Sequence, residues 1–274
     1  MLKRLLPRSI ARRMGLSHVR HLPRFDYPGD VYLVSYPRSG NTWVRFLLGN
    51  YLSGNACRFT NCDSFVPDIH FDRAACDQAP RPRVMKSHMP FVPQYGRVIY
   101  LVRDVRDVAV SYYHFQRKYG AIPSDLPLAD FLHERFNAGK ADGMGLWTDH
   151  VESWLDRGPR QFQLHRYEDL RRDPVGGLTK MIRFVGLECD PARIEAAVQA
   201  ASFDSMKKIE KQDHDKFRGL AQTDASVPFV RSGRTGGRDP LLTDELRREL
   251  TRVHRPALER LGYLQPDEAR NSAA

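Results

Sequence analysis

The segment VYLVSYPRSGNTW, residues 31–43, constrains the fold of this chain more than any other stretch. A run typical of a buried β-strand, residues 31–35, leads into a short loop that contains Ser39 and Gly40, and a helical pattern begins near Thr42. Successive backbone N–H groups in such a loop, with the positive end of a following helix, form a cradle for an anion. The segment therefore predicts a strand–loop–helix unit that binds a phosphoryl or sulfuryl group.

Three further short β-rich runs occur along the chain, at residues 83–87, 97–102 and 161–166. Helical periodicity follows residues 97–102, with Asp104 placed as an N-cap. This alternation predicts the α/β class: a single domain with a central parallel sheet flanked by helices, which binds ligands at the carboxyl ends of its strands. A closing helix is expected over residues 243–261.

The length and composition agree with one domain. The chain has 274 residues, of which 41% are hydrophobic, so it can bury one large core. We expect a basic N-terminal arm over residues 1–29, the domain over residues 30–264 and a flexible tail over residues 265–274. The 43 Lys and Arg residues outnumber the 33 Asp and Glu residues, which favours an acidic partner: a nucleotide, a nucleic acid or an anionic membrane face.

Four cysteines at uneven spacing, with no signal peptide ahead of them, indicate reduced thiols and a cytoplasmic protein. The gaps between Cys57, Cys62, His70 and Cys76 match no common zinc pattern, so no metal site is expected. No apolar run approaches the length of a transmembrane helix. The basic arm could make at most weak contact with a membrane surface.

Two more segments place charged or hydrogen-bonding side chains at or just after the ends of predicted strands. In MKSHMP, residues 85–90, Lys86 and His88 lie two residues apart, so both side chains can point the same way. A histidine can accept the proton of an attacking hydroxyl, and a neighbouring lysine can stabilise negative charge. In YLVRDVRDVAVSYYHF, residues 100–115, Arg103 and Ser111 are able to share one phosphate. The combination predicts group transfer to an alcohol.

Two other classes of protein would also suit a basic α/β chain. A P-loop-type kinase or NTPase needs the motif G-x-x-x-x-G-K-[ST] and a carboxylate for Mg²⁺. Here Gly40 is followed by Asn41 instead of lysine, and no such carboxylate can be placed. A basic nucleic-acid-binding module would contain a docking motif, and none is recognised. Both classes stay as alternatives to a group-transfer enzyme.

These motifs together resemble the soluble sulfotransferases that use 3′-phosphoadenosine 5′-phosphosulfate (PAPS). YPRSGNTW is similar to the family's phosphosulfate loop, MKSHMP to its K-T-H-L-P segment, and YLVRDVRDVAVSYYHF to its 3′-phosphate motif. WTDHVESWLDRG, HRYEDLRRDP, SFDSMK and FVRSGRTGG resemble later family segments in the same order. The resemblance covers about residues 30–261 and implies an enzyme that releases 3′,5′-ADP and binds no nucleic acid.

The resemblance also implies a role for each matching residue. His88 would be the general base, while Arg38 and Lys86 would stabilise charge on the sulfuryl group during in-line transfer to a hydroxyl, or to an amine, of a small molecule. No metal is required, because fixed cations do this work. The implied donor-binding residues are Arg38, Ser39, Gly40, Asn41 and Thr42 at the 5′-phosphate, Trp43, Tyr167 and Phe203 at the adenine, and Arg103, Ser111, Arg231, Ser232 and Gly233 at the 3′-phosphate.

Three departures from the family pattern stand out. Arg38 replaces the usual loop lysine, and Ser232 replaces the lysine of the family's R-K-G segment. Residues 239–249 lack the Lys-x-x-x-Thr-Val pattern through which relatives dimerise, so the oligomeric state stays open. The loops expected to hold the acceptor, residues 55–82 and 120–145, mix aromatic and acidic side chains and do not suggest the long basic groove of a polymer-binding site. The K-x-H pair resembles the small-molecule enzymes of the family, which implies an apolar hydroxylated small molecule in preference to a polysaccharide without identifying it.

Overall fold

The computed structural model describes residues 29–264 except 71, 72, 218, 232, 234, 237 and 238, and it leaves the side chain of residue 73 undescribed. Nearly all of the predicted N-terminal arm and the whole predicted tail therefore lie outside the described residues. No helix in the described ranges is long and apolar enough to cross a membrane.

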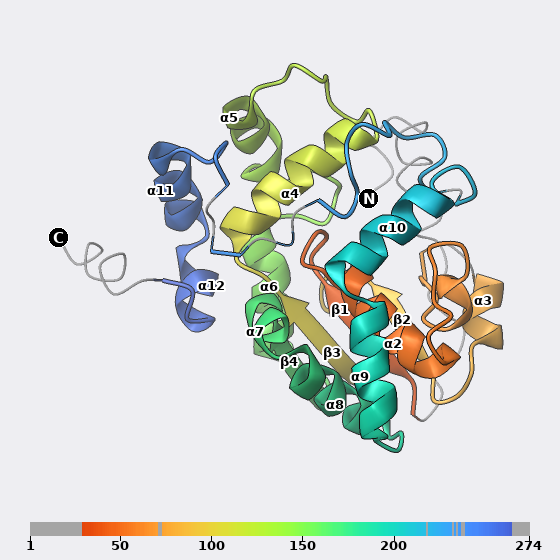
Figure 1. The fold of residues 1–274 in the computed structure, drawn as a ribbon. Coiled ribbons are helices and arrows are strands. Elements are labelled where there is room, and N and C mark those ends of the chain that lie inside the picture. Colours follow the sequence, from red (N-terminus) through yellow and green to blue (C-terminus); the bar gives the residue numbers. More distant parts are fainter. Residues whose placement is uncertain are drawn as a thin grey trace.

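The centre of the molecule is a parallel sheet of four strands, which confirms the predicted α/β class (Figure 1). Its strands are β1 (Val31–Ser35), β2 (Val84–Ser87), β3 (Arg97–Val102) and β4 (Gln161–Arg166), and they lie in the order β2-β1-β3-β4. Strand β2, the next along the chain, pairs with one edge of β1, and β3 pairs with the other edge. The carboxyl ends of β1 and β3 therefore border the crevice where such sheets bind ligands.

One face of the sheet is covered by helices from the middle and the end of the chain (Figure 1). Tyr32 and Val34 of β1 point to this face because successive side chains of a strand alternate. Trp147 and Trp154 are fully buried in the same cluster. The covering elements are α4 (Val105–Lys118), α5 (Leu128–Phe131), the π-helical turn η4 (Leu132–Phe136), α6 (Trp147–Arg157), α11 (Asp244–Val253) and α12 (Arg255–Arg260).

The opposite face receives Val31 and Leu33 of β1 and forms a second core cluster (Figure 1). The helices that cover it are α2 (Asn41–Ser53), α7 (Tyr167–Arg172), α8 (Pro174–Val185), α9 (Pro191–Ala200) and α10 (Phe203–Asp213). The short turn η3 (Cys62–Ser64) and the short helix α3 (Arg73–Gln78) connect α2 to β2. The sheet is thus sandwiched between two helical layers, each with its own apolar core.

The prediction of a single closing helix over residues 243–261 is wrong. The structure divides this segment into α11 and α12, which are separated by His254. Pro256 explains the break, because a proline has no N–H to donate and its ring clashes with the carbonyl group four residues earlier. By contrast, the predicted N-cap is confirmed: the Asp104 carboxylate accepts a hydrogen bond from the N–H of Arg106 at the start of α4.

Candidate active site

The loop between β1 and α2 is shaped by two residues with left-handed backbones. Arg38 has φ 69° and Gly40 has φ 98°. A Cβ atom on Gly40 would lie 2.5 Å from Cδ2 of Tyr167, so only glycine fits against this ring. Gly40 offers no side-chain cap to α2, where Asn41, Thr42 and Trp43 form the first turn. The N–H groups of this turn lack intrahelical partners and are suited to bind an anion.

The guanidinium group of Arg38 is enclosed by aromatic rings. Its Cζ atom lies 4.7 Å from the ring centroids of both Phe115 and Phe229. Its Nε donates a hydrogen bond of 3.3 Å to the Ser111 hydroxyl. Burial lowers the pKa of Arg38 to about 10, which leaves the side chain positively charged at neutral pH. Arg38, which is predicted at the 5′-phosphosulfate, thus contacts Ser111, which is predicted at the 3′-phosphate.

Two further arginines gather near Arg38. Arg103 Nη1 donates to the carbonyl oxygen of Arg38 at 3.5 Å, and its guanidinium lies 4.5 Å from the centroid of the Tyr167 ring. Arg231 forms an ion pair of 2.6 Å with Asp239. The positive charges of Arg103 and Arg231 both act to lower the pKa of Arg38. The three cations create a basic site at the carboxyl edge of the sheet.

Two aromatic side chains predicted at the adenine have separate neighbours: Trp43 packs against the Tyr167 ring, with 5.6 Å between centroids, and Phe203 lies beside Gly233. Trp43 is held by a hydrogen bond of 3.0 Å from its Nε1 to the carbonyl oxygen of Ala201. Gly233 approaches Phe203 closely, because a Cβ atom on Gly233 would lie 3.6 Å from the Phe203 ring. Ser232 is outside the described residues. Sequence reasoning missed Arg171, whose guanidinium lies 5.4 Å from the Trp43 ring centroid.

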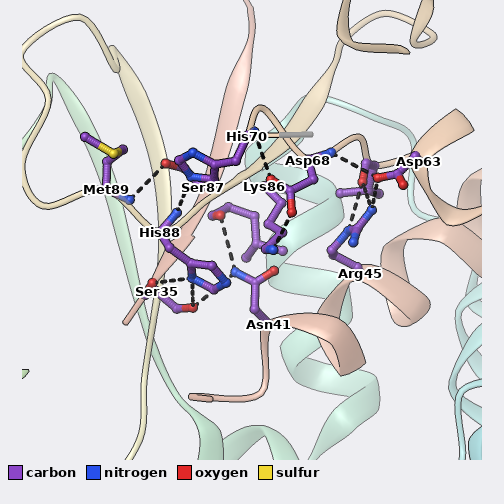
Figure 2. A network of polar contacts seen from close by, with 12 residues as sticks. Ser35, Asn41, Arg45, Asp63, Asp68, His70, Lys86, Ser87, His88 and Met89 are labelled. Carbon is purple, nitrogen blue, oxygen red and sulfur yellow. Dashed lines mark hydrogen bonds and ion pairs between the residues drawn. The ribbon is translucent and has the colours of Figure 1, made fainter. Parts of the chain in front are cut away.

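His88 follows β2 and lies at the carboxyl end of β1 (Figure 2). Its ring Nδ1 lies 2.7 Å from the carbonyl oxygen of Ser35, which can only accept a hydrogen bond. The proton of the neutral ring is therefore on Nδ1, and Nε2 keeps its lone pair. Burial, followed by the positive charge of Lys86, lowers the pKa of His88 well below its usual value. The imidazole is thus neutral at neutral pH.

The Ser35 side chain links His88 to the anion-binding loop. The amide of Asn41 donates to the Ser35 hydroxyl at 3.1 Å, and this hydroxyl lies 3.4 Å from Nδ1 of His88 (Figure 2). Asn41 also donates to the carbonyl oxygen of Leu33 at 3.4 Å. The first residue of α2 therefore fixes the end of β1, and the end of β1 fixes the histidine.

Lys86 is paired with a buried carboxylate that sequence reasoning missed. Its Nζ lies 2.5 Å from Oδ2 of Asp68, a residue that is only 3% exposed (Figure 2). Burial opposes ionisation of this carboxyl group, but the nearby positive charge of Lys86 outweighs it and the pKa of Asp68 lies well below its usual value. Lys86 therefore lies beside His88 as the positively charged member of an ion pair with Asp68. No cluster of three or more His, Cys, Asp or Glu side chains in the described ranges could hold a metal ion.

The family model for the sulfotransferase domain matches residues 28–262. The chain belongs to the sulfotransferase family. Sulfotransferase 1A1 of Bos taurus is 31% identical over 228 residues, which cover 77% of this sulfotransferase and 77% of that relative. Sulfotransferase 1B1 of Mus musculus is 29% identical over 228 residues, with 76% of each chain covered.

Solved structures of other proteins resemble this sulfotransferase. Mouse sulfotransferase SULT7A1 complexed with PAP is 25% identical, with a TM-score of 0.66 and 86% of each chain covered. Retinol dehydratase in a complex with retinol and PAP gives a TM-score of 0.70 at 20% identity, covering 90% of this chain and 86% of that one. This second likeness concerns the fold. The predicted enzyme class and fold are both confirmed.

Proposed function

We propose that this sulfotransferase transfers the sulfuryl group of PAPS to the hydroxyl group of a small molecule, with His88 as the general base. The observation that carries the proposal is the orientation of the His88 ring. Because Nδ1 donates to the Ser35 carbonyl oxygen, Nε2 has a free lone pair at the carboxyl end of β1, next to the anion-binding loop.

Several features of the site fit a nucleotide with phosphates at both ends of its ribose. The Ser39 hydroxyl is buried and has no hydrogen-bond partner among the described residues, so a ligand oxygen could satisfy it. The uncapped first turn of α2 suits the 5′-phosphosulfate. Arg103 and Ser111 lie within reach of Arg38 and suit the 3′-phosphate. The PAP in the mouse neighbour SULT7A1 supports the same ligand class.

The chain's own residues would divide the work of the reaction. His88 removes the proton of the acceptor hydroxyl through Nε2 and carries it until product release. Arg38 and Lys86 stabilise negative charge at the sulfuryl group, and positioning with fixed charges supplies most of the acceleration in such loose, in-line transfers. PAPS supplies the activated sulfuryl group: as the bond from sulfur to the acceptor oxygen forms, the bond from sulfur to the bridging phosphate oxygen breaks, and 3′,5′-ADP leaves with that electron pair.

Replacing His88 by alanine tests this function. We expect single-turnover sulfuryl transfer to fall by about 10²–10⁴-fold, the range of general-base contributions. Affinity for 3′,5′-ADP should stay nearly unchanged, because His88 contacts no part of the nucleotide in the proposed arrangement. Wild-type activity should also fall as the pH drops through the lowered pKa of His88, since a protonated imidazole cannot accept a proton. Retention of more than about a tenth of the rate would exclude the general-base role.

The class of donor is tested separately by thermal unfolding. We expect 3′,5′-ADP to stabilise the protein, by about 2.7 kcal/mol at a concentration of 100 times its Kd. ATP with Mg²⁺ and a single-stranded oligonucleotide serve as controls for the kinase and nucleic-acid-binding alternatives. Stabilisation by either control alone would contradict the proposal. Phenols, sterols, lipid alcohols and sugars, screened with labelled PAPS, would then identify the acceptor.

A further inference from the structure

Both backbone hydrogen-bonding groups of His88 contact the ring of another histidine. The N–H of His88 donates to Nε2 of His70 at 3.1 Å (Figure 2). Its carbonyl oxygen lies 3.2 Å from Nε2 of His150. With the contact between its own ring and Ser35, His88 is held at three points by three separate segments of the chain. None of these contacts was anticipated from the sequence, where only His88 was assigned a role.

His70 acts in this arrangement as a hydrogen-bond acceptor. A backbone N–H can only donate, so Nε2 of His70 must be unprotonated and the ring proton must lie on Nδ1. Burial lowers the pKa of His70, which keeps the ring neutral and able to accept. The charged groups that face it are Lys86, which favours the neutral ring, and Asp68, which opposes this effect. The backbone N–H of His70 is anchored in turn on Oδ1 of Asp68, at 3.0 Å.

His150 acts from the opposite side as a hydrogen-bond donor. A carbonyl oxygen can only accept, so Nε2 of His150 carries the proton and Nδ1 accepts from the hydroxyl group of Tyr100, 3.0 Å away. His150 is fully buried in α6, and burial lowers its pKa to about 4. The indole N–H of Trp154, also in α6, donates to the carbonyl oxygen of Met89 at 3.0 Å. Helix α6 thus anchors the segment that carries His88.

We propose that His70 and His150 are positioning residues that fix the backbone of His88, so that its Nε2 meets the acceptor hydroxyl. The inference rests on the proposed function, in which His88 is the general base. Catalysis is sensitive to such positioning, because a displacement of about 1 Å at a reacting group can cost roughly 100-fold in rate. His70 and His150 themselves touch no reacting atom in this arrangement.

The sharpest test compares two replacements of His70. His70→Gln places an amide oxygen near the position of Nε2 and can still accept the N–H of His88, whereas His70→Leu cannot. We expect His70→Leu to lower kcat by about 10–100-fold and His70→Gln to stay within about threefold of the wild type. Affinity for 3′,5′-ADP and the acceptor KM should change little in either variant. An equal loss of kcat in both variants would overturn the inference.

His165 provides a matched control. It is 7% exposed, close to the 8% of His70, and its Nε2 pairs with Gln163 in β4, away from His88. His165→Leu therefore reports what the loss of a buried histidine does to the fold alone, and its kcat should stay near that of the wild type. At His150, Gln can still donate to the carbonyl oxygen of His88, so His150→Gln should retain more activity than His150→Leu.

A double-mutant cycle separates the inference from the proposed function on which it rests. In a His88→Ala background, adding His70→Leu should cost almost no further activity, because the residue to be positioned is already absent. The same fractional loss in both backgrounds would show that His70 acts independently of His88 and would overturn the inference. High activity of His88→Ala alone would instead contradict the general-base role.

Discussion

Replacing Gly40 by alanine would probe the tightest contact of the anion-binding loop. Gly40 has φ 98°, where an L-residue costs about 1–2 kcal/mol. The new Cβ atom would also lie 2.5 Å from Cδ2 and 2.7 Å from Cε2 of Tyr167, so the ring would have to move. Overpacking of this kind costs about 1–3 kcal/mol more. We therefore expect the free energy of unfolding to fall by about 2–5 kcal/mol in total.

The same replacement should weaken nucleotide binding, because the displaced Tyr167 ring supports Arg103 and borders Trp43. The guanidinium of Arg103 lies 4.5 Å from the centroid of this ring, and the Trp43 ring lies 5.6 Å from it. A charge-assisted contact to phosphate is worth about 1.5–3 kcal/mol, so its loss should raise the Kd of 3′,5′-ADP by roughly 10–100-fold. Calorimetry would measure this change, and urea unfolding would measure the stability.

Gly186 supplies a control with the same backbone cost and no clash. It follows α8 with φ 91°, and a Cβ atom there would meet nothing within 4 Å. Gly186→Ala should therefore lose only about 1–2 kcal/mol and bind 3′,5′-ADP like the wild type. If both variants lose equal stability and bind equally well, the contact between Gly40 and Tyr167 does not constrain the loop, and our reasoning is refuted.

Three further predictions follow from the same geometry. Replacing Arg103 or Ser111 by alanine should weaken the binding of 3′,5′-ADP by about 1.5–3 kcal/mol and leave the binding of a nucleotide without the 3′-phosphate unchanged. If calorimetry shows equal weakening for both nucleotides, neither residue belongs to the 3′-phosphate site. The Glu210 carboxylate accepts hydrogen bonds from the backbone N–H groups of Phe229 and Val230. Glu210→Ala should therefore speed hydrogen exchange at both amides, and unchanged exchange would show that this carboxylate does not hold residues 229 and 230 in place. Burial lowers the pKa of His150 from 6.5 to about 4. Between these two pH values the unfolded chain binds a proton at this residue and the folded protein does not. The free energy of unfolding therefore keeps its full value above pH 6.5 and decreases as the pH falls toward 4. Urea unfolding should show the wild type losing up to about 3 kcal/mol more than His150→Gln over that range, and equal losses would contradict it.

Local patterns in the sequence were sufficient to predict the sheet and the loops at its carboxyl edge. The β-rich runs gave the bounds of β1, β3 and β4 as the structure has them, and β2 differs by one residue. Asp104 was recognisable as an N-cap because capping depends on neighbours two or three residues away. Pro256 also carried a local signal that the closing helix breaks, although the amphipathic pattern around it obscured that signal.

The contacts that shape the site could not be predicted, because they join segments far apart in the chain. Asp68 lies 18 residues from Lys86, and Phe229 lies 191 residues from Arg38. No periodicity relates such positions, so only tertiary packing brings them together. Arg171 is an intermediate case: it follows Tyr167 by four residues on α7, a spacing that places both side chains on one helix face.

The unequal burial of the three tryptophans gives the protein an intrinsic optical reporter. Trp147 and Trp154 are completely enclosed in the core, so neither indole presents any surface to a ligand. Trp43 is only partly buried and is one of the residues predicted at the adenine. A change in tryptophan emission during a nucleotide titration would therefore originate mainly from one indole. Donor binding could then be followed in the unlabelled wild-type enzyme, without a sulfated product or a radioactive donor.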